Sequence, residues 1–241
     1  MSEKKIVILG GSGAIGSNIA TEVIKEGYKP IIIGRNEKTI IETSKLLDCD
    51  YKIVDITDRE KLVSSLEKCG EDIHGLAYCV GSINIKSITQ AKENDFIESY
   101  KINVIGAINS CKALIPNLKR NKGSILFFST VAVKQGFPNH TIISTAKGAI
   151  EGLTLSLAAE LAPNIRVNCI APSITNSEMS KNILANETIK KAIESMHPIP
   201  KIGSGKDFGK LSAFLLSKNN DWITGQIFNI DGGRSSLRIR S

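Results

Sequence analysis

The sequence predicts an α/β protein in which seven parallel strands form a doubly wound sheet with helices on both faces. Short runs rich in Ile and Val alternate with longer amphipathic segments along the chain. The apolar runs are nearly continuous, which is typical of strands buried on both faces of a parallel sheet. No linker, low-complexity tract or internal repeat divides the 241 residues, so we expect a single domain over residues 1–241.

The first half of the chain predicts four strands joined by helices. Strands are expected at 4–10, 29–34, 50–56 and 73–81, and helices at about 14–27, 37–47 and 58–69. Each apolar run is followed by a segment with helical periodicity, so the connections are crossovers between parallel strands.

The second half continues the same alternation. It predicts a long helix at about 94–119, a strand at 123–130, a second long helix at about 142–161 and a strand at 164–172. A looser helical region covers about 177–217 and is interrupted by "HPIPKIGSG", after which residues 225–231 form the closing strand.

Composition and charge argue against several classes of function. The net charge is +7, but the lysines are spread along helical faces without interleaved aromatics, so we expect no nucleic-acid binding and rather anionic ligands such as phosphates or acyl carriers. The five cysteines and three histidines are scattered, which indicates reduced thiols, no metal site and a cytoplasmic protein. No apolar run is long enough for a membrane span, and we interpret the lysine-containing start as retained structure.

A glycine-rich turn, "ILGGSGAIGSNIA", follows the first strand and opens the first helix. Gly10 permits the tight turn, while Ala14 and Gly16 keep the backbone clear for a pyrophosphate and for helix packing. The free N–H groups of the helix start would bind the phosphates. We therefore expect a Rossmann-type dinucleotide site whose turn contributes Gly10, Ser12, Gly13, Ala14, Ile15 and Gly16.

The end of the second strand indicates which dinucleotide binds. A carboxylate there would bond the adenosine ribose and select NAD, but the chain reads "IIIGRN". The Arg35 guanidinium can instead pair with a 2′-phosphate, which favours NADP. The other interpretation is a solvent-exposed arginine that merely starts a helix.

In these and further motifs the chain resembles the short-chain dehydrogenase/reductase family, of the classical type that includes 3-oxoacyl carrier-protein reductases. The resemblance spans nearly the whole chain and rests on "GGSGAIG", "VDITD", "YKINVIGAI", "RVNCIAPSIT" and "GQIFNIDGG". It implies a cofactor site that also includes Asp55 at the adenine, Ile56, Gly81, Lys147, Pro172, Thr175 and Ser177. It also implies that residues of about 177–203 shape the substrate pocket.

The resemblance assigns catalytic roles to Asn103, Thr130 and Lys147, with Thr130 where the family has Ser. In the family a Tyr four residues before the Lys protonates the carbonyl oxygen, and this chain has Ile143 there. Lys147 keeps its role at the nicotinamide ribose, because that role needs only charge and reach. His140, one turn before Ile143, is the candidate replacement acid, and a surface loop histidine is the alternative.

Two further departures from the family pattern concern the surroundings of this set. The family's "NNAG" reads "YCVG", and Ser173 replaces a glycine of the loop near the nicotinamide. Tyr78, in "YCVG", is a second phenol, but its place at the end of a strand makes core packing the better interpretation.

Three functions remain open at this point. The first is an NADP(H)-dependent oxidoreductase acting on a carbonyl or hydroxyl substrate through an atypical active site. The second is a catalytically silent NADP-binding regulatory or structural subunit, and the third is a non-redox enzyme on the same scaffold. The sequence leaves the small-molecule substrate and the direction of reaction open.

The two long helices also predict an assembly. The segment "AIEGLTLSLAAELA" is apolar or small on nearly all sides, as in a helix that is buried all round. The resemblance implies that the helices at 94–119 and 142–161 pair with their copies and that the closing strand forms a second interface. We expect a homotetramer, with a dimer as the alternative.

Overall fold

The computed structural model describes residues 3–238 and has at its centre one sheet of seven parallel strands. The strand order is β3-β2-β1-β4-β5-β6-β7, so the predicted doubly wound fold is confirmed. The strands are β1 (Lys5–Leu9), β2 (Lys29–Gly34), β3 (Asp50–Ile53), β4 (Ile73–Tyr78), β5 (Ser124–Phe128), β6 (Arg166–Pro172) and β7 (Ile227–Ile230). The chain reverses its direction of travel across the sheet between β1 and β4, and a crevice opens at such a switch point in sheets of this kind.

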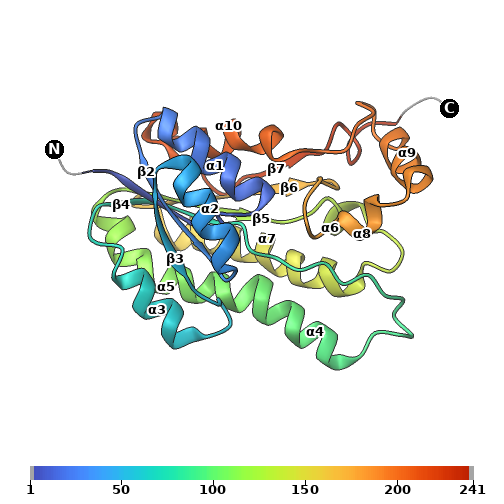
Figure 1. The fold of residues 1–241 in the computed structure, drawn as a ribbon, viewed down its shortest axis with the longest axis horizontal. Helices are drawn as coiled ribbons and strands as arrows, with labels where there is room; N and C mark the ends of the chain where they lie inside the picture. Colours follow the sequence, from blue (N-terminus) through green and yellow to red (C-terminus); the bar gives the residue numbers. More distant parts are fainter. Residues whose placement is uncertain (1–2, 239–241) are drawn as a thin grey trace.

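Helices cover both faces of the sheet (Figure 1). One layer contains α1 (Ala14–Lys25), α2 (Glu37–Leu47) and α10 (Gly205–Leu216), and the other contains α3 (Arg59–Glu67), α4 (Glu93–Tyr100), α5 (Gly106–Arg120) and α7 (Thr141–Leu161). Helices α1 and α10 approach closely, since a Cβ added to Gly205 would lie 1.9 Å from the Ala14 carbonyl oxygen. That contact places the start of α1 directly against the start of α10.

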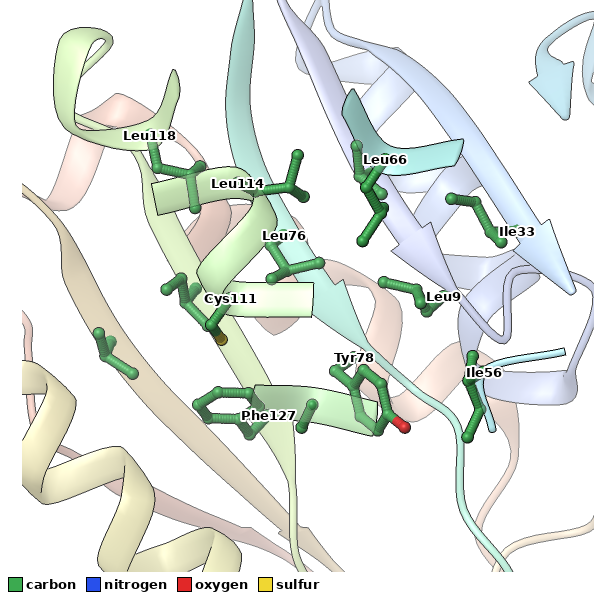
Figure 2. Close-up of a cluster of buried hydrophobic side chains, with 14 of the residues drawn as sticks. Leu9, Ile33, Ile56, Leu66, Leu76, Tyr78, Cys111, Leu114, Leu118 and Phe127 are labelled. Carbon is green, nitrogen blue, oxygen red and sulfur yellow. The ribbon is translucent and has the colours of Figure 1, made fainter. Parts of the chain in front are cut away.

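The larger core cluster lies between the sheet and the layer of α3, α5 and α7 (Figure 2). Leu76 and Phe127 from neighbouring strands are fully buried there, together with Leu114 of α5. Burial of one such side chain stabilises the fold by about 1.5–3 kcal/mol. The near-continuous apolar strands of the sequence are explained by this two-sided burial.

The predicted helix at 94–119 differs from the structure in its middle. Between α4 and α5 lies the π-helical turn η1 (Lys101–Ile105), which changes the helical register around Asn103. The buried Tyr78 hydroxyl donates a hydrogen bond of 2.6 Å to the Ile102 carbonyl in this turn. Gly106 makes room for that phenol, because a Cβ there would lie 2.3 Å from it. Tyr78 is thus a core residue, as expected.

The predicted loose helical region at 177–217 contains three separate helices. They are α8 (Lys181–Leu184), α9 (Glu187–Ser195) and α10, and a bridge between Thr175 and Gly203 closes the base of the first two. The short helices α6 (Ala132–Gln135) and η2 (Lys218–Asn220) were not expected, and β3 ends three residues earlier than predicted. Within residues 3–238, no helix has the length and apolarity needed to cross a bilayer.

Candidate functional site

The turn between β1 and α1 provides a cradle of bare backbone at the carboxyl end of the sheet. Gly10 has φ = +75°, and a Cβ there would lie 3.0 Å from the Cys79 carbonyl group. A Cβ on Gly16 would lie 2.3 Å from the Gly10 carbonyl oxygen. Gly13 is the N-cap of helix α1 and provides no side-chain cap, and the first turn of the helix contains no acidic residue. Its N–H groups and positive dipole end therefore suit a phosphate.

Beside this turn, the ends of β2 and β3 supply the next predicted residues. Arg35 is exposed directly after β2, and within the described chain it makes no ion pair. The Thr57 backbone N–H and hydroxyl, 2.9 and 2.7 Å from Asp55, lower the pKa of that carboxyl, and the nearby charge of Arg35 contributes. Ile56 is buried, and the Ser12 hydroxyl lies 3.3 Å from that of Thr39.

Lys147 and Asn103 meet behind Gly81. A Cβ added to Gly81 would lie 3.2 Å from Asn103 Oδ1 and 3.4 Å from Lys147 Nζ. The Lys147 ammonium donates to the Phe128 carbonyl at 2.8 Å, and burial lowers its pKa to about 8. Asn103 donates to the Ser99 carbonyl at 2.8 Å, while its fully buried Oδ1 has no partner within residues 3–238. An orphaned acceptor beside a buried cation marks a place where a ligand or water belongs.

The end of β5 carries a second polar group. The Ser129 hydroxyl donates a hydrogen bond of 2.8 Å to the buried Glu151 carboxylate. Glu151 lies one turn after Lys147 on α7, and its carboxylate is thus bonded to Ser129 and not to the lysine. Thr130 Oγ1 accepts the Ala132 N–H at 3.3 Å at the start of α6. Its hydroxyl hydrogen remains available for a substrate oxygen.

The start of α7 holds the two residues about which the sequence was ambiguous. Ile143 is buried and carries no polar group. His140 is half-buried in the loop before α7, where its Nδ1 lies 2.7 Å from the Pro138 carbonyl. A carbonyl only accepts, so Nδ1 carries the proton. Its ring packs edge-on against Phe137, with centroids 5.4 Å apart.

The loop after β6 carries the last predicted cofactor residues. The Pro172 carbonyl accepts the Val131 N–H at 3.0 Å, which places this loop next to the end of β5. Thr175 donates to the Ser173 carbonyl at 3.0 Å, and the Ser177 N–H donates to Ser180 at the same distance. These bonds hold the loop in one shape at the base of α8.

Two residues beside this loop, His197 and Arg234, are not predicted from the sequence. The Ser173 hydroxyl lies 2.8 Å from Nε2 of the buried His197, and Arg234 lies 3.5 Å from the same oxygen. His197 comes from a segment that no motif marks, and Arg234 directly follows the motif "GQIFNIDGG" without being part of it. The signal available in the sequence was Ser173 itself, where the family pattern has glycine.

The donors gathered at this end suit a dinucleotide and not a metal ion. The glycine cradle, Arg35 and Lys147 offer N–H groups and positive charge to phosphates and ribose hydroxyls. No group of three or more His, Cys, Asp or Glu side chains within residues 3–238 is arranged to hold a metal ion.

Comparisons with known proteins agree with this geometry. A family model described as enoyl-(acyl carrier protein) reductase matches residues 11–235. The chain is 29% identical over 244 residues to a peroxisomal 2,4-dienoyl-CoA reductase of Saccharomyces cerevisiae, with 95% of this chain and 83% of the relative covered. It is 26% identical to the 3-oxoacyl-acyl-carrier-protein reductase of Chlamydia trachomatis, with 95% and 96% covered.

Solved structures match the fold over almost the whole chain. A short-chain type dehydrogenase/reductase from Mycobacterium ulcerans superposes with a TM-score of 0.90 at 25% identity, covering 99% of this chain and 92% of that one. The structure of ElxO with NADP bound has a TM-score of 0.90 at 28% identity and covers 98% and 100%. With the family model spanning nearly all of the sequence, the chain belongs to the short-chain dehydrogenase/reductase family of oxidoreductases.

Proposed function

We propose that the protein is an NADP(H)-dependent oxidoreductase acting on a carbonyl or hydroxyl substrate at the carboxyl end of its sheet. The surroundings of Lys147 carry this proposal. Lys147 is 8% exposed as a residue, and within residues 3–238 its ammonium bonds only to a neutral carbonyl. A buried cation without a carboxylate is costly. The ribose hydroxyls of a nicotinamide cofactor would complete its hydrogen bonds and those of the orphaned Asn103 oxygen.

The proposed cofactor residues follow the site from one end to the other. The glycine cradle binds the pyrophosphate, Arg35 the 2′-phosphate, Asp55 and Ile56 the adenine, and Lys147 the nicotinamide ribose. The complete proposed set is Gly10, Ser12, Gly13, Ala14, Ile15, Gly16, Arg35, Asp55, Ile56, Gly81, Lys147, Pro172, Thr175 and Ser177. NADP(H) supplies or accepts the hydride when bound, and the ElxO structure with NADP supports this choice.

The residues of the chain perform the proton chemistry and the positioning. The Thr130 hydroxyl donates its hydrogen to the substrate oxygen, while its own oxygen accepts the Ala132 N–H. Asn103 and Lys147 hold the ribose and a water for proton relay. Ile143 stands where the family resemblance places a tyrosine and supplies no proton. Loss of a positioned general acid costs about 10²–10⁴ in rate.

His140 is the proposed replacement acid. Its Nδ1 proton is committed to the Pro138 carbonyl, while no hydrogen bond within residues 3–238 engages Nε2. That second nitrogen is the one available to a substrate.

A specific observation favours a second function, that of a catalytically silent NADP-binding subunit. The buried aliphatic Ile143 replaces the group that would deliver the proton, while the cofactor residues are retained. Such a protein would bind the dinucleotide and regulate or support another chain.

Stopped-flow measurement of NADPH oxidation separates these two functions. The substrates are ketones, quinones, acyl thioesters and, because of the yeast relative, conjugated enoyl thioesters. We expect hydride transfer to at least one class. Tight NADPH binding with no turnover on any of them would overturn the reductase and support the silent subunit.

Residues 177–203, with helices α8 and α9, are the proposed wall of the substrate pocket. This segment follows the cofactor loop directly and lies at the same end of the molecule as α6 (Figure 1). It joins the cofactor loop through the Thr175–Gly203 bridge. Its composition identifies no single compound.

The proposed assembly is a homotetramer in the cytoplasm. Large apolar side chains remain exposed on two separate surfaces of the described chain. One comprises Ile97, Tyr100 and Ile105 around α4 and η1, with Leu155 on α7, and the other comprises Phe214 on α10 and Trp222 before β7. Trp222 is 96% exposed. Two such surfaces would give two interfaces, and light scattering at micromolar concentration tests this; a monomer would contradict it.

A further inference from the structure

The Arg234 guanidinium lies beyond the cofactor loop with only neutral contacts. One nitrogen lies 3.5 Å from Ser173 Oγ and another lies 3.4 Å from the Met196 sulfur. Its central carbon stacks 4.5 Å from the centre of the Phe137 ring. No carboxylate within residues 3–238 pairs with it. Five N–H donors are therefore mostly unused on a half-buried cation.

The nearby acid is committed elsewhere. Asp231 accepts the Gly233 and Ser235 N–H groups at 2.8 and 2.9 Å, and also the Ser235 hydroxyl. These bonds shape the turn after β7, so the carboxylate stabilises its own loop. Burial lowers the pKa of Arg234, and the nearby charge of Asp231 offsets only part of that effect.

The Ser173–His197 pair fixes the near edge of the arginine. His197 Nδ1 lies 2.8 Å from the Ile193 carbonyl, so this nitrogen carries the proton. In the neutral ring Nε2 then accepts the Ser173 hydroxyl hydrogen, and the serine oxygen presents a lone pair toward Arg234. His197 is 3% exposed, so the arrangement is sheltered. Ser173 and His197 are positioning residues for the guanidinium.

Phe137 connects this cation to the proposed reaction centre. Its ring contacts Arg234 on one side and His140 on another. Ser173 directly follows Pro172, whose carbonyl bonds to the turn after Thr130. A substrate whose carbonyl lies at Thr130 would therefore extend toward Arg234.

We propose that Arg234 binds the carboxylate of the substrate, so that the substrate class is an oxo acid or the corresponding hydroxy acid. This inference rests on the proposed function, because it assumes a reacting carbonyl beside Thr130. A planar guanidinium with N–H groups that lack a charged partner matches the two oxygens of a carboxylate. Stacking on Phe137 holds the plane in place.

Short oxo acids, each compared with its methyl ester, test the proposal. The measured quantity is the ratio of kcat/KM for the acid to that for the ester in the presence of NADPH. Charge-assisted hydrogen bonds of this kind correspond to a preference of about tenfold to a hundredfold. We expect Arg234→Gln to bring the ratio close to one and Arg234→Lys to give an intermediate value, mainly through KM.

Arg120→Gln is the matched control, because Arg120 pairs with Glu71 on the surface at 2.8 Å. It should keep the wild-type ratio. Equal kcat/KM for acid and ester in the wild type would overturn the proposal without any variant. The test therefore remains valid even if Arg234→Gln fails to fold.

Calorimetry separates this inference from the proposed function. If no compound turns over, the same oxo acids and esters are titrated into the NADP-bound protein. Binding of the acids that Arg234→Lys weakens would support the carboxylate site although the reductase had failed. Absence of binding, or equal binding of acid and ester, would overturn it.

Discussion

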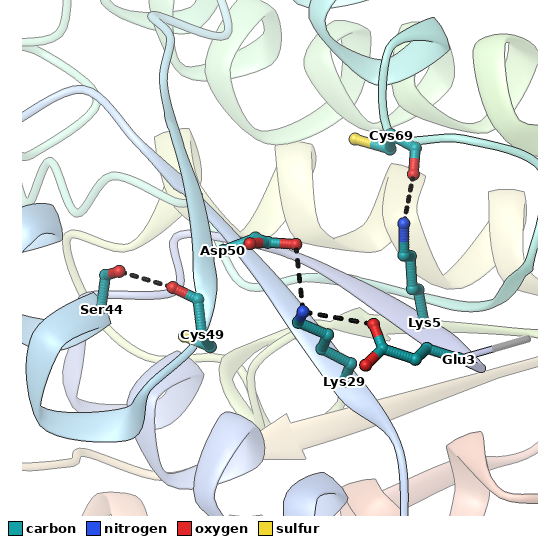
Figure 3. Close-up of polar contacts among 7 residues, drawn as sticks. All are labelled: Glu3, Lys5, Lys29, Ser44, Cys49, Asp50 and Cys69. Atoms are coloured by element: carbon teal, nitrogen blue, oxygen red, sulfur yellow. Dashed lines mark hydrogen bonds and ion pairs between the residues drawn. The ribbon is translucent and has the colours of Figure 1, made fainter.

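The two ends of the sheet differ in whether their positively charged side chains have acidic partners. At the amino ends of β1, β2 and β3 lies a hollow of about 860 Å³, lined among others by Lys4, Lys29, Lys45 and Asp50. Lys29 contacts Glu3 at 3.2 Å and Asp50 at 3.9 Å, and Lys5 donates to the Cys69 carbonyl (Figure 3). The cation at the centre of this network has acidic partners, and the side chains are largely exposed.

The carboxyl end has the opposite character. Lys147 is buried and bonded only to a carbonyl, Arg234 stacks on an aromatic ring, and Asn103 has an oxygen without a partner within residues 3–238. The hollow of about 860 Å³ therefore lies on the side where the charged groups already have partners. Unsatisfied groups, rather than the size of the hollow, indicate where a ligand completes the structure.

The largest effect on turnover is expected when one lysine at the carboxyl end of the sheet is replaced and compared with the same replacement at the amino end. Lys147→Met should lower turnover by about 10²–10⁴, because it removes both the ribose contact and the charge of the proton relay. Lys29→Met should leave kcat and KM close to wild type. Steady-state kinetics and NADPH titration on the two variants check this. Comparable losses in both would show that the two ends do not differ in function.

The second prediction concerns the missing acid. Ile143→Tyr places a phenol one turn before Lys147 and should raise turnover on a generic ketone by about tenfold or more, if a general acid is absent there. His140→Ala should instead remove the native activity and shift its pH profile. Kinetics of both variants across pH check this. Should neither variant differ from wild type, His140 is not the proton donor and the silent subunit becomes the better proposal.

The sequence predicted the sheet well because its signals are local and repeated. Apolar runs such as "IVIL" and "ILFF" and the glycine turn are recognisable without neighbours. The π-helical turn at Asn103 escaped prediction, because apolar periodicity continues through it. The Ile102 carbonyl in this turn accepts a hydrogen bond from Tyr78, which is 24 residues away in the chain.

The site was predictable only where motifs mark it. Family motifs marked Lys147 and Asn103 as candidates, and the structure places both next to Gly81. Arg234 and His197 were not predicted, because each is singled out only by its contact with Ser173. Arg234 is 61 residues and His197 is 24 residues away from Ser173 in the chain. Neither residue carries a local pattern, so only the folded chain brings them together.

The third prediction tests the choice of cofactor. Arg35→Ala should reduce the preference for NADPH over NADH by about tenfold or more, because a charge-assisted hydrogen bond contributes roughly 1.5–3 kcal/mol. Lys45→Ala, on the hollow at the other end, should preserve that preference. Titration calorimetry with both cofactors measures it. Equal affinity for the two in the wild type would mean that Arg35 does not select the 2′-phosphate.

The smallest effect is expected from pH and again concerns Lys147. Burial lowers its pKa from 10.5 to about 8, so the folded chain binds fewer protons than the unfolded chain between these values. The free energy of unfolding must therefore increase as pH rises from about 8 to 10.5. Below that window the buried charge of Lys147 destabilises the fold most. The proposed contact with the cofactor uses the charged ammonium, so NADPH binding should follow the opposite trend.

We therefore expect NADPH affinity to fall as pH rises from about 7 to about 9, by no more than about tenfold per unit. Over the same range the melting temperature of the free protein should fall less in wild type than in Lys147→Met, because only the wild type releases a buried charge. Lys29→Met should keep the wild-type dependence of affinity on pH, since that ammonium is exposed and paired. Calorimetry and thermal melts on the three proteins measure both slopes. Parallel slopes in wild type and Lys147→Met would place the Lys147 titration outside this range and weaken the contrast between the two ends of the sheet.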